Sequence, residues 1–252
     1  MIECYPLRGL ASSHVLIAVA WIILAAVSGE CQASSMRAAG CPTDDHQTAS
    51  AGGDASDAIG ATSPALFEVR ASSFPELART DLRVRLFHSQ SDYFRARFSV
   101  SRFLLLMPMR YFVDVNPALF LGPPASDGTC AILAHELAHV VSLTRGNRIR
   151  RLGLIRLLSQ RYTVKFERGA DLEAIHRGYG DGLKTYRTWV YSHVPPGKLQ
   201  EKRRNYFSPK EITALQMKLQ EQPDLFQYWS LHVPTNLQEI QRTGSGPANH
   251  IR

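Results

Sequence analysis

The fold is decided by the stretch Ala131-Ile-Leu-Ala-His135-Glu136-Leu-Ala-His139-Val-Val141, an apolar run that contains neither glycine nor proline. The run is long enough for a buried helix. Residues four positions apart share one face of a helix, so His135 and His139 can aim imidazole nitrogens at a single point. Glu136 follows about 100° round the helix, where its carboxylate can flank a metal-bound water without being a ligand itself.

The polar residues of this run indicate a metal centre. An unpaired charge buried in an apolar helix costs several kcal/mol, and a metal ion removes that cost by taking up the lone pairs. The pattern H-E-x-x-H at 135–139 is the arrangement of a zinc hydrolase, with two His ligands, an open coordination position and a general base. The expected cofactor is therefore Zn²⁺, with Glu136 as the catalytic base.

A second pattern, Glu167-Arg-Gly-Ala-Asp171, offers the remaining protein ligand. It opens a predicted helix that continues to about Ile175. Glu167 can ligate the metal, while Asp171, four residues on, accepts the N–H of a ligand histidine and fixes its orientation. Asp171 is therefore predicted to support the site from behind its ligands.

Other residues could provide the third ligand. A metzincin would place a histidine at position 145 and a glycine at 142, but these positions hold Arg145 and Ser142, so that class is excluded. His176 and Glu173 stay open as competitors of Glu167.

The motifs H-E-L-A-H and E-R-G-A-D resemble the gluzincins, and within them the family of HtpX and the CAAX-processing proteases with its minimal soluble forms. The resemblance covers residues 105–180. It implies a zinc-dependent endopeptidase with an α+β, zincin-like fold. In such a fold a small sheet with an edge strand precedes the active-site helix, and the C-terminal part is mainly helical. The implied ligands are His135, His139 and Glu167, and the implied base is Glu136.

The same resemblance points to His232 as a further catalytic residue. The family carries a C-terminal His-Pro followed by Arg-Ile, which contacts the transition state. The nearest segment here is Leu231-His-Val-Pro234, and Arg242 lies further along than the family pattern puts it. Spacing alone leaves Tyr179, His176 and His232 open as donors to the oxyanion.

Composition sets the domain organisation. The chain has 252 residues, of which 44% are hydrophobic and 20% charged, as in globular proteins rather than disordered or repeat ones. Residues 1–33 read as a signal peptide, or as an N-terminal anchor through the apolar segment 15–27. Residues 34–64, rich in Ala, Ser, Gly and Asp, read as a flexible linker. The metallopeptidase domain is placed at 65–244 and a disordered tail at 245–252.

Export to the periplasm or the medium follows if the leader is a signal peptide. In that case Cys41 and Cys130 can form a disulfide, with a buried free thiol at Cys130 as the alternative.

The charge pattern bears on partners. The net charge of +7 favours anionic surfaces. The basic segment Arg145–Arg161, interleaved with leucines, fits either a helix on an anionic membrane or a solvated helix that covers the active-site helix. The export signal and the absence of a recognised module argue against nucleic acid, and the expected partner is a peptide or protein substrate.

Alternation of apolar and polar residues predicts strands at 82–87, 94–100 and 110–116. By resemblance the last is the edge strand that binds extended peptide, with a core strand as the equal alternative. Helices are predicted at 183–193, at 208–222 behind a capping box with proline at its first position, and at 236–242.

Two other function classes stay open. One is a catalytically silent zinc domain, against which the intact Glu136 argues, because a structural site needs no base. The other is a membrane-surface binding protein that acts through the basic segment.

Overall fold

The computed structural model describes residues 55–145 and 159–243. The predicted leader at 1–33, most of the predicted linker, most of the basic segment and the predicted tail lie outside these residues. In the part that is described, no helix combines the length and the hydrophobicity that crossing a membrane requires. The fold is mixed, with a small three-stranded sheet among many helices, which confirms the α+β prediction in its coarse form.

The first described helix begins inside the predicted linker. Helix α2 spans Ala55–Ser73, so it starts ten residues before the predicted boundary at 65. Ala58, Thr62, Leu66 and Val69 recur at helical spacing and are all buried. The Ala- and Ser-rich composition of 55–64 predicts a tether, because small side chains bury little apolar surface. In the structure, Ala58 and Thr62 form one buried stripe with Leu66 and Val69.

The three predicted strands are present. Strand β1 spans Asp81–Leu86, β2 spans Phe94–Phe98 and β3 spans Arg110–Val115. The sheet order is β1-β3-β2, with β1 parallel and β2 antiparallel to β3.

The prediction that 110–116 is an edge strand was therefore wrong. Strand β3 is central, and β2 is the edge strand that lies against helix α4. The physical reason is burial on both faces. Tyr111, Val113 and Val115 face the core, and even Asp114 on the opposite face is fully buried, as expected for a strand with a neighbour on each side.

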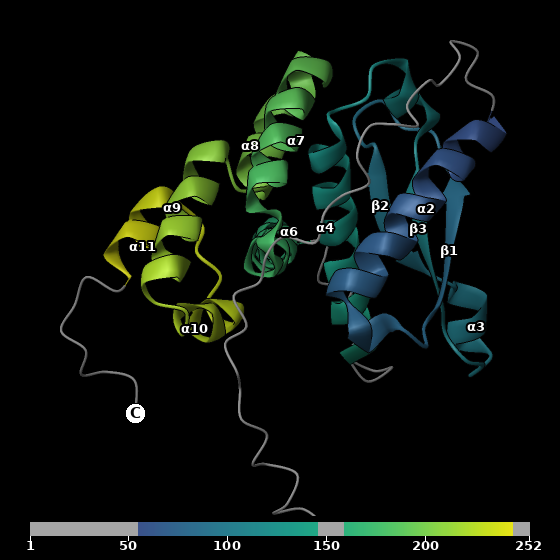
Figure 1. The fold of residues 1–252 in the computed structure, drawn as a ribbon, viewed down its shortest axis with the longest axis horizontal. Helices are drawn as coiled ribbons and strands as arrows, with labels where there is room; N and C mark the ends of the chain where they lie inside the picture. Colours follow the sequence, from purple (N-terminus) through teal and green to yellow (C-terminus); the bar gives the residue numbers. More distant parts are fainter. Residues whose placement is uncertain (1–54, 146–158, 244–252) are drawn as a thin grey trace, which may run out of the picture. The chain divides into compact units, whose positions relative to one another are not determined.

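One face of the sheet packs on helices. Leu82 of β1, Phe94 of β2 and Val113 of β3 are buried in the same core as helix α2 and helix α4, which spans Ser126–Arg145. Figure 1 shows α4 between the sheet and the C-terminal helices, which places its two faces against different neighbours. Short helices join these elements: η1 (Pro75–Leu77), α3 (Val100–Leu104) and η2 (Pro117–Leu121).

The remaining helices in the described ranges are α6 (Gln160–Ala174), the π-helical turn η4 (Ile175–Tyr179), α7 (Gly180–His193), α8 (Pro196–Asn205), α9 (Pro209–Glu221), α10 (Leu225–Leu231) and α11 (Leu237–Arg242). The predicted capping box is confirmed at α9, where Ser208 and Glu211 cap each other's backbone. Helix α6 begins seven residues before Glu167, so this residue lies inside the helix rather than opening it.

Two glycines allow the helices to reach the site. Gly178 in η4 has φ 92°, which breaks the rod between α6 and α7. At Gly182 of α7, an added Cβ would stand 2.3 Å from the carbonyl oxygen of Asp127 in α4. Helix α7 therefore packs backbone to backbone on α4, close enough for its side chains to reach behind the histidines.

Cys130 of α4 is buried and disulfide-bonded, which favours the disulfide over the free thiol. The other three cysteines, at positions 4, 31 and 41, lie outside the described residues. The pairing with Cys41 stays a prediction.

Candidate metal centre

Helix α4 brings its two histidines together as the motif spacing predicts. His135 and His139 are both buried, with exposed fractions of 1% and 6%. Their rings meet edge to face with centroids 4.6 Å apart, and their Nε2 atoms are 3.1 Å apart. The ring of His139 also stacks on Phe166 of α6, the neighbour of Glu167, which aligns the two helices at this point.

Helix α6 adds a carboxylate to this pair. Glu167 Oε2 lies 3.1 Å from His139 Nε2 and 3.3 Å from His135 Nε2. Four ligands at tetrahedral angles, with bonds of about 2.0–2.1 Å, stand about 3.3 Å from one another. The three atoms therefore have the mutual spacing of ligands on one ion, and this cluster could hold a metal.

The donor chemistry of the cluster fits a cation. His135 Nδ1 lies 2.7 Å from Asp171 Oδ1, so this nitrogen carries the proton and Nε2 offers a lone pair. The Glu167 oxygen and the His139 Nε2 face the same point. His139 Nε2 can donate a proton to Glu167 in the metal-free protein, or offer a lone pair with the other two atoms when a cation lies between them.

The pKa of His135 reports the negative field of the site. Burial disfavours the charged imidazole, but Asp171 and Glu167 outweigh it and raise the pKa of His135 to about 9. Burial likewise opposes ionisation of Glu167, yet the two histidines hold the pKa of this carboxyl well below its usual range. In the metal-free protein, a proton therefore takes the place that a cation would fill.

The two competing ligands are engaged elsewhere. His176 stacks on Phe226 with ring centroids 3.7 Å apart, and Glu173 pairs with Arg177. Of the three carboxylate and imidazole candidates on this helical stretch, the structure brings only Glu167 to the histidines.

Asp171 lies behind His135 and is itself held in place. The carboxyl is completely buried, and it accepts hydrogen bonds from Arg187 Nη2 at 2.6 Å and from the backbone N–H of Phe207 at 3.1 Å. Burial opposes its ionisation, but Arg187 and His135 together keep the pKa of Asp171 below its usual value. The result is a chain of contacts, Arg187 to Asp171 to His135, that fixes one imidazole before any ion binds.

Arg187 is a residue that the sequence did not reveal. It comes from α7, sixteen residues after Asp171, and is 3% exposed. Its guanidinium also lies over the ring of Tyr206, 4.2 Å from the centroid. No local motif marks this position, because the contact depends on how α7 folds back onto α4 and α6.

Glu136 is placed differently from the three ligand residues. It is 4% exposed, and within the described part of the chain its Oε2 has no hydrogen-bond partner. The backbone N–H of Ala96 in β2 lies within hydrogen-bonding reach of the carboxylate, but burial is the larger effect and raises the pKa of Glu136. A carboxyl group with a raised pKa and a free oxygen is suited to accept and release a proton.

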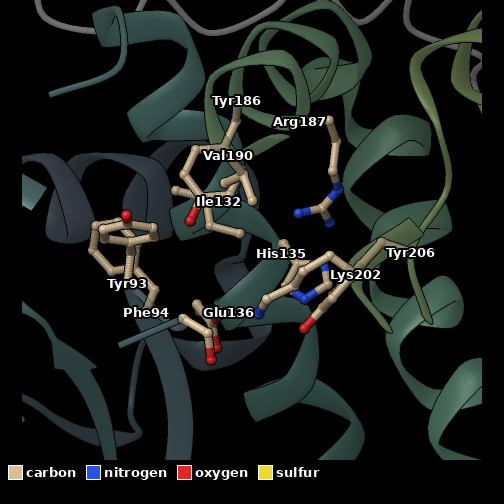
Figure 2. Close-up of a pocket in the computed structure, with 11 residues that line it drawn as sticks. Tyr93, Phe94, Ile132, His135, Glu136, Tyr186, Arg187, Val190, Lys202 and Tyr206 are labelled. Carbon is tan, nitrogen blue, oxygen red and sulfur yellow. The ribbon is translucent and has the colours of Figure 1, made fainter. Parts of the chain in front are cut away.

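A pocket opens beside His135 and Glu136. Figure 2 shows the side chains around it, with apolar groups from β2, α4 and α7 and polar groups from α4, α7, α8 and the segment after α8. The lining residues are Ser91, Tyr93, Phe94, Ile132, His135, Glu136, Tyr186, Arg187, Val190, Lys202 and Tyr206. The pocket therefore lies beside the side chain of Glu136, whose unpartnered Oε2 is itself buried.

None of the three candidate oxyanion donors lines this pocket. The hydroxyl of Tyr179 is 2.8 Å from Ser73 Oγ, and His176 stacks on Phe226. His232 is exposed, stacks on Tyr228 and lies 3.3 Å from its carbonyl oxygen through Nδ1. The structure thus does not bring His232 to the candidate metal centre. His232 directly follows α10, and the packing of α10 against α6 and α9 holds it beside Tyr228 instead.

Tyr206 lines the pocket in their place. Its ring lies beside His135 with centroids 5.8 Å apart (Figure 2), and burial raises the pKa of its hydroxyl well above 10. The phenol therefore keeps its proton and remains a hydrogen-bond donor. Lys202 also lines the pocket, but its ammonium is paired with Asp92 at 2.5 Å.

The chain was compared with protein-family models, with curated proteins and with solved structures, and none of the three comparisons finds a match.

Proposed function

We propose that this protein is a zinc-dependent endopeptidase, with His135, His139 and Glu167 as metal ligands and Glu136 as general base. The observation that carries the proposal is the pairing of a convergent ligand cluster with a buried carboxylate that is not part of it. A silent metal site has no use for a further buried carboxyl group beside its three ligands, with one oxygen unpartnered among the described residues, because burying such a group costs folding free energy. The resemblance to the HtpX and CAAX-processing proteases supports the same assignment.

The three ligand residues and Glu136 have distinct roles in the proposed amide hydrolysis. A zinc ion in the cluster would supply a Lewis acid that polarises the scissile carbonyl and makes a water molecule more acidic. Glu136 accepts the proton of the attacking water and delivers it to the leaving amine. The raised pKa of Glu136 serves both steps, because a carboxylate with a pKa nearer neutrality both takes up and returns a proton readily.

The developing negative charge on the substrate oxygen needs a donor from the protein. Tyr206 is the group we assign to this role, since it lines the pocket beside His135 and its hydroxyl stays protonated. Arg187 lines the same pocket, but its guanidinium is committed to Asp171.

The substrate backbone has a place to dock on β2. Tyr93 O and Ser99 N bond to β3, so in an antiparallel pair residues 93, 95, 97 and 99 direct their backbone groups toward β3. The N–H and C=O groups of Phe94, Ala96 and Phe98 therefore face the opposite edge, on which no described strand pairs and where the Ala96 N–H lies within reach of Glu136. Because Ala96 is next to Glu136, an extended peptide added to this edge passes in front of the general base.

The substrates proposed are exported or membrane-associated proteins, since residues 1–33 read as an export signal or anchor. Peptide-bond hydrolysis at an open strand edge suits extended or unfolded segments of such proteins.

The test joins metal content with cleavage. Elemental mass spectrometry of the purified chain is expected to give one zinc per molecule, and a peptide library is expected to be cleaved. Glu136→Gln should retain zinc and lose cleavage. Tyr206→Phe should also retain zinc and lower kcat by roughly 10²–10³-fold, the usual cost of one oxyanion donor.

The control is Tyr191→Phe. Tyr191 has a buried hydroxyl without a partner among the described residues and does not line the pocket. Its removal should leave kcat unchanged. Zinc-loaded protein that cleaves no peptide would leave the metal site standing and refute the peptidase.

A further inference from the structure

The segment between β2 and β3 exposes an unusual amount of apolar surface. Leu104, Leu105 and Leu106 are 69%, 70% and 75% exposed. With Val100 and Met107 they make five of the eleven large hydrophobic residues that are exposed in the described part of the chain, all within eight positions. We call residues 100–107 the apolar tip. Contiguous exposed apolar surface of this kind marks contact with a partner or a membrane.

The apolar tip is held by hydrogen bonds rather than left loose. The Ser99 side chain caps α3 by accepting from the Arg102 backbone N–H. The Arg102 guanidinium donates to the Pro108 carbonyl at 3.2 Å, and the Met107 N–H donates to the Arg102 carbonyl at 2.9 Å. Phe103 anchors the tip by turning inward onto Phe98. The exposed leucines are therefore presented by an ordered scaffold.

Leu106 adds an observation of strain. Its φ is 57°, and it is the only non-glycine residue with positive φ in the described ranges. Bulky side chains rarely adopt this conformation, and asparagine or glycine would fit it better. Leu106 is strained and three-quarters exposed, so its side chain contributes nothing evident to folding stability. Contact with another molecule explains a leucine at this position better than a structural role does.

The sheet face next to the apolar tip is basic. By strand alternation and register, the outer face carries Arg83 and Arg85 from β1, Arg95 and Arg97 from β2, and Arg110 from β3. The acidic residues on this face are Asp81 and Asp114, so five arginines against two carboxylates leave a formal charge of +3. Four of the arginine side chains are 43–59% exposed. We call this surface the arginine face.

We propose that the apolar tip inserts into the interface of an anionic phospholipid membrane while the arginine face lies against the headgroups. Exposed leucines joined to a basic surface are the combination found in peripheral membrane-binding surfaces. Each arginine near a negatively charged leaflet adds attraction. A second copy of this chain is a poorer occupant, because its own arginine face would be brought up against the first. This proposal does not rest on the metal centre or on hydrolysis.

The experiment reads the depth of the tip directly. In the full chain, Leu105→Trp is mixed with vesicles of brominated phosphatidylcholine and phosphatidylglycerol, and the quenching of its fluorescence is measured above the background of the wild-type tryptophans. Leu121→Trp is the matched control. Leu121 is 87% exposed, but it lies in η2, which follows the C-terminal end of β3, whereas the apolar tip precedes the N-terminal end of that strand. Strong quenching at 105 and little at 121 is the expected result.

Equal quenching at both positions, or none at 105, would overturn the proposal. A blue shift at 105 that appears without vesicles and grows with protein concentration would show a second copy on the tip and would overturn it as well.

Two further variants test the charge and exclude misfolding. Arg83→Gln with Arg97→Gln removes two positive charges and leaves Arg85 and Arg95 with Asp114. The vesicle concentration at half-maximal quenching of Leu105→Trp should then rise about tenfold or more. An unchanged concentration would contradict the role of the arginine face.

Leu106→Asn, added to Leu105→Trp, should weaken the quenching of the tryptophan by the vesicles. Its thermal stability should stay equal or rise, because asparagine relieves the strain of the positive φ. Loss of stability in that variant would identify a structural role instead.

Discussion

Replacing Asp171 with asparagine tests how the buried carboxylate supports the metal centre. The side chain keeps its shape but loses the charge that His135 and Arg187 contact at 2.7 Å and 2.6 Å. Loss of a carboxylate behind a ligand histidine typically costs 10–100-fold in metal affinity, or about 1.4–2.7 kcal/mol. The same change strands Arg187, 3% exposed, without its counter-ion. Breaking a buried pair in this way costs about 3–5 kcal/mol of unfolding free energy.

Two comparisons separate these effects. Arg187→Met added to Asp171→Asn removes both charges, so it should restore most of the unfolding free energy while zinc affinity stays low. Glu211→Gln breaks the other buried ion pair of α6, in which Arg168 Nη1 lies 2.8 Å from Glu211 Oε1. Glutamine still satisfies the capping box of α9. This control should lose stability to a similar extent but keep its zinc affinity.

The assays are zinc competition with a chromophoric chelator and urea denaturation of the metal-free chain. Zinc affinity that is unchanged in Asp171→Asn would refute the reasoning. So would an equal loss of affinity in Glu211→Gln, because that would trace the effect to global stability rather than to the orientation of His135.

Three further outcomes follow from burial and charge. Glu136→Gln should raise the unfolding free energy of the metal-free chain at neutral pH, because burial raises the pKa of Glu136 and its charged form opposes folding; urea denaturation measures this, and a loss of stability would contradict it. The raised pKa of His135 implies stability that is fully present below pH 6.5 and is lost as the pH rises through about 9, so denaturation of metal-free protein should show this decline and a zinc-loaded sample should not. Gly182→Ala should destabilise the chain by about 1–3 kcal/mol, since its Cβ would meet the Asp127 carbonyl, whereas Gly197→Ala, with nothing within 4 Å, should be nearly neutral in thermal unfolding.

The ligand cluster could be predicted because its geometry is local. His135 and His139 are separated by one helical turn, and so are Glu167 and Asp171, so each pair has a fixed relation whatever the rest of the chain does. Only the packing of α4 against α6 depends on the tertiary fold. Burial along α4 was equally readable, as the apolar run indicates a helix covered on all sides.

The remaining features depend on tertiary packing. The order β1-β3-β2 is not encoded in any one strand, so the sequence leaves both an edge and a core position open for 110–116, and the structure shows that this strand is central. Arg187 and Tyr206 reach the site from α7 and from the segment after α8, at separations that no motif records. His232 was carried over from a resemblance whose spacing differs here, and the structure keeps it with Tyr228.

The free edge of β2 has a consequence for the protein in solution. An uncovered strand edge is a template on which any chain can extend the sheet, including another copy of the same protein, and this is a common start of aggregation. Two copies that joined through β2 would bring Arg95 and Arg97 of each onto one face, where like charges on neighbouring strands repel. A peptide without those charges meets no such barrier. Arg95 and Arg97, which share the counter-ion Asp114, would therefore disfavour pairing between two copies at this edge.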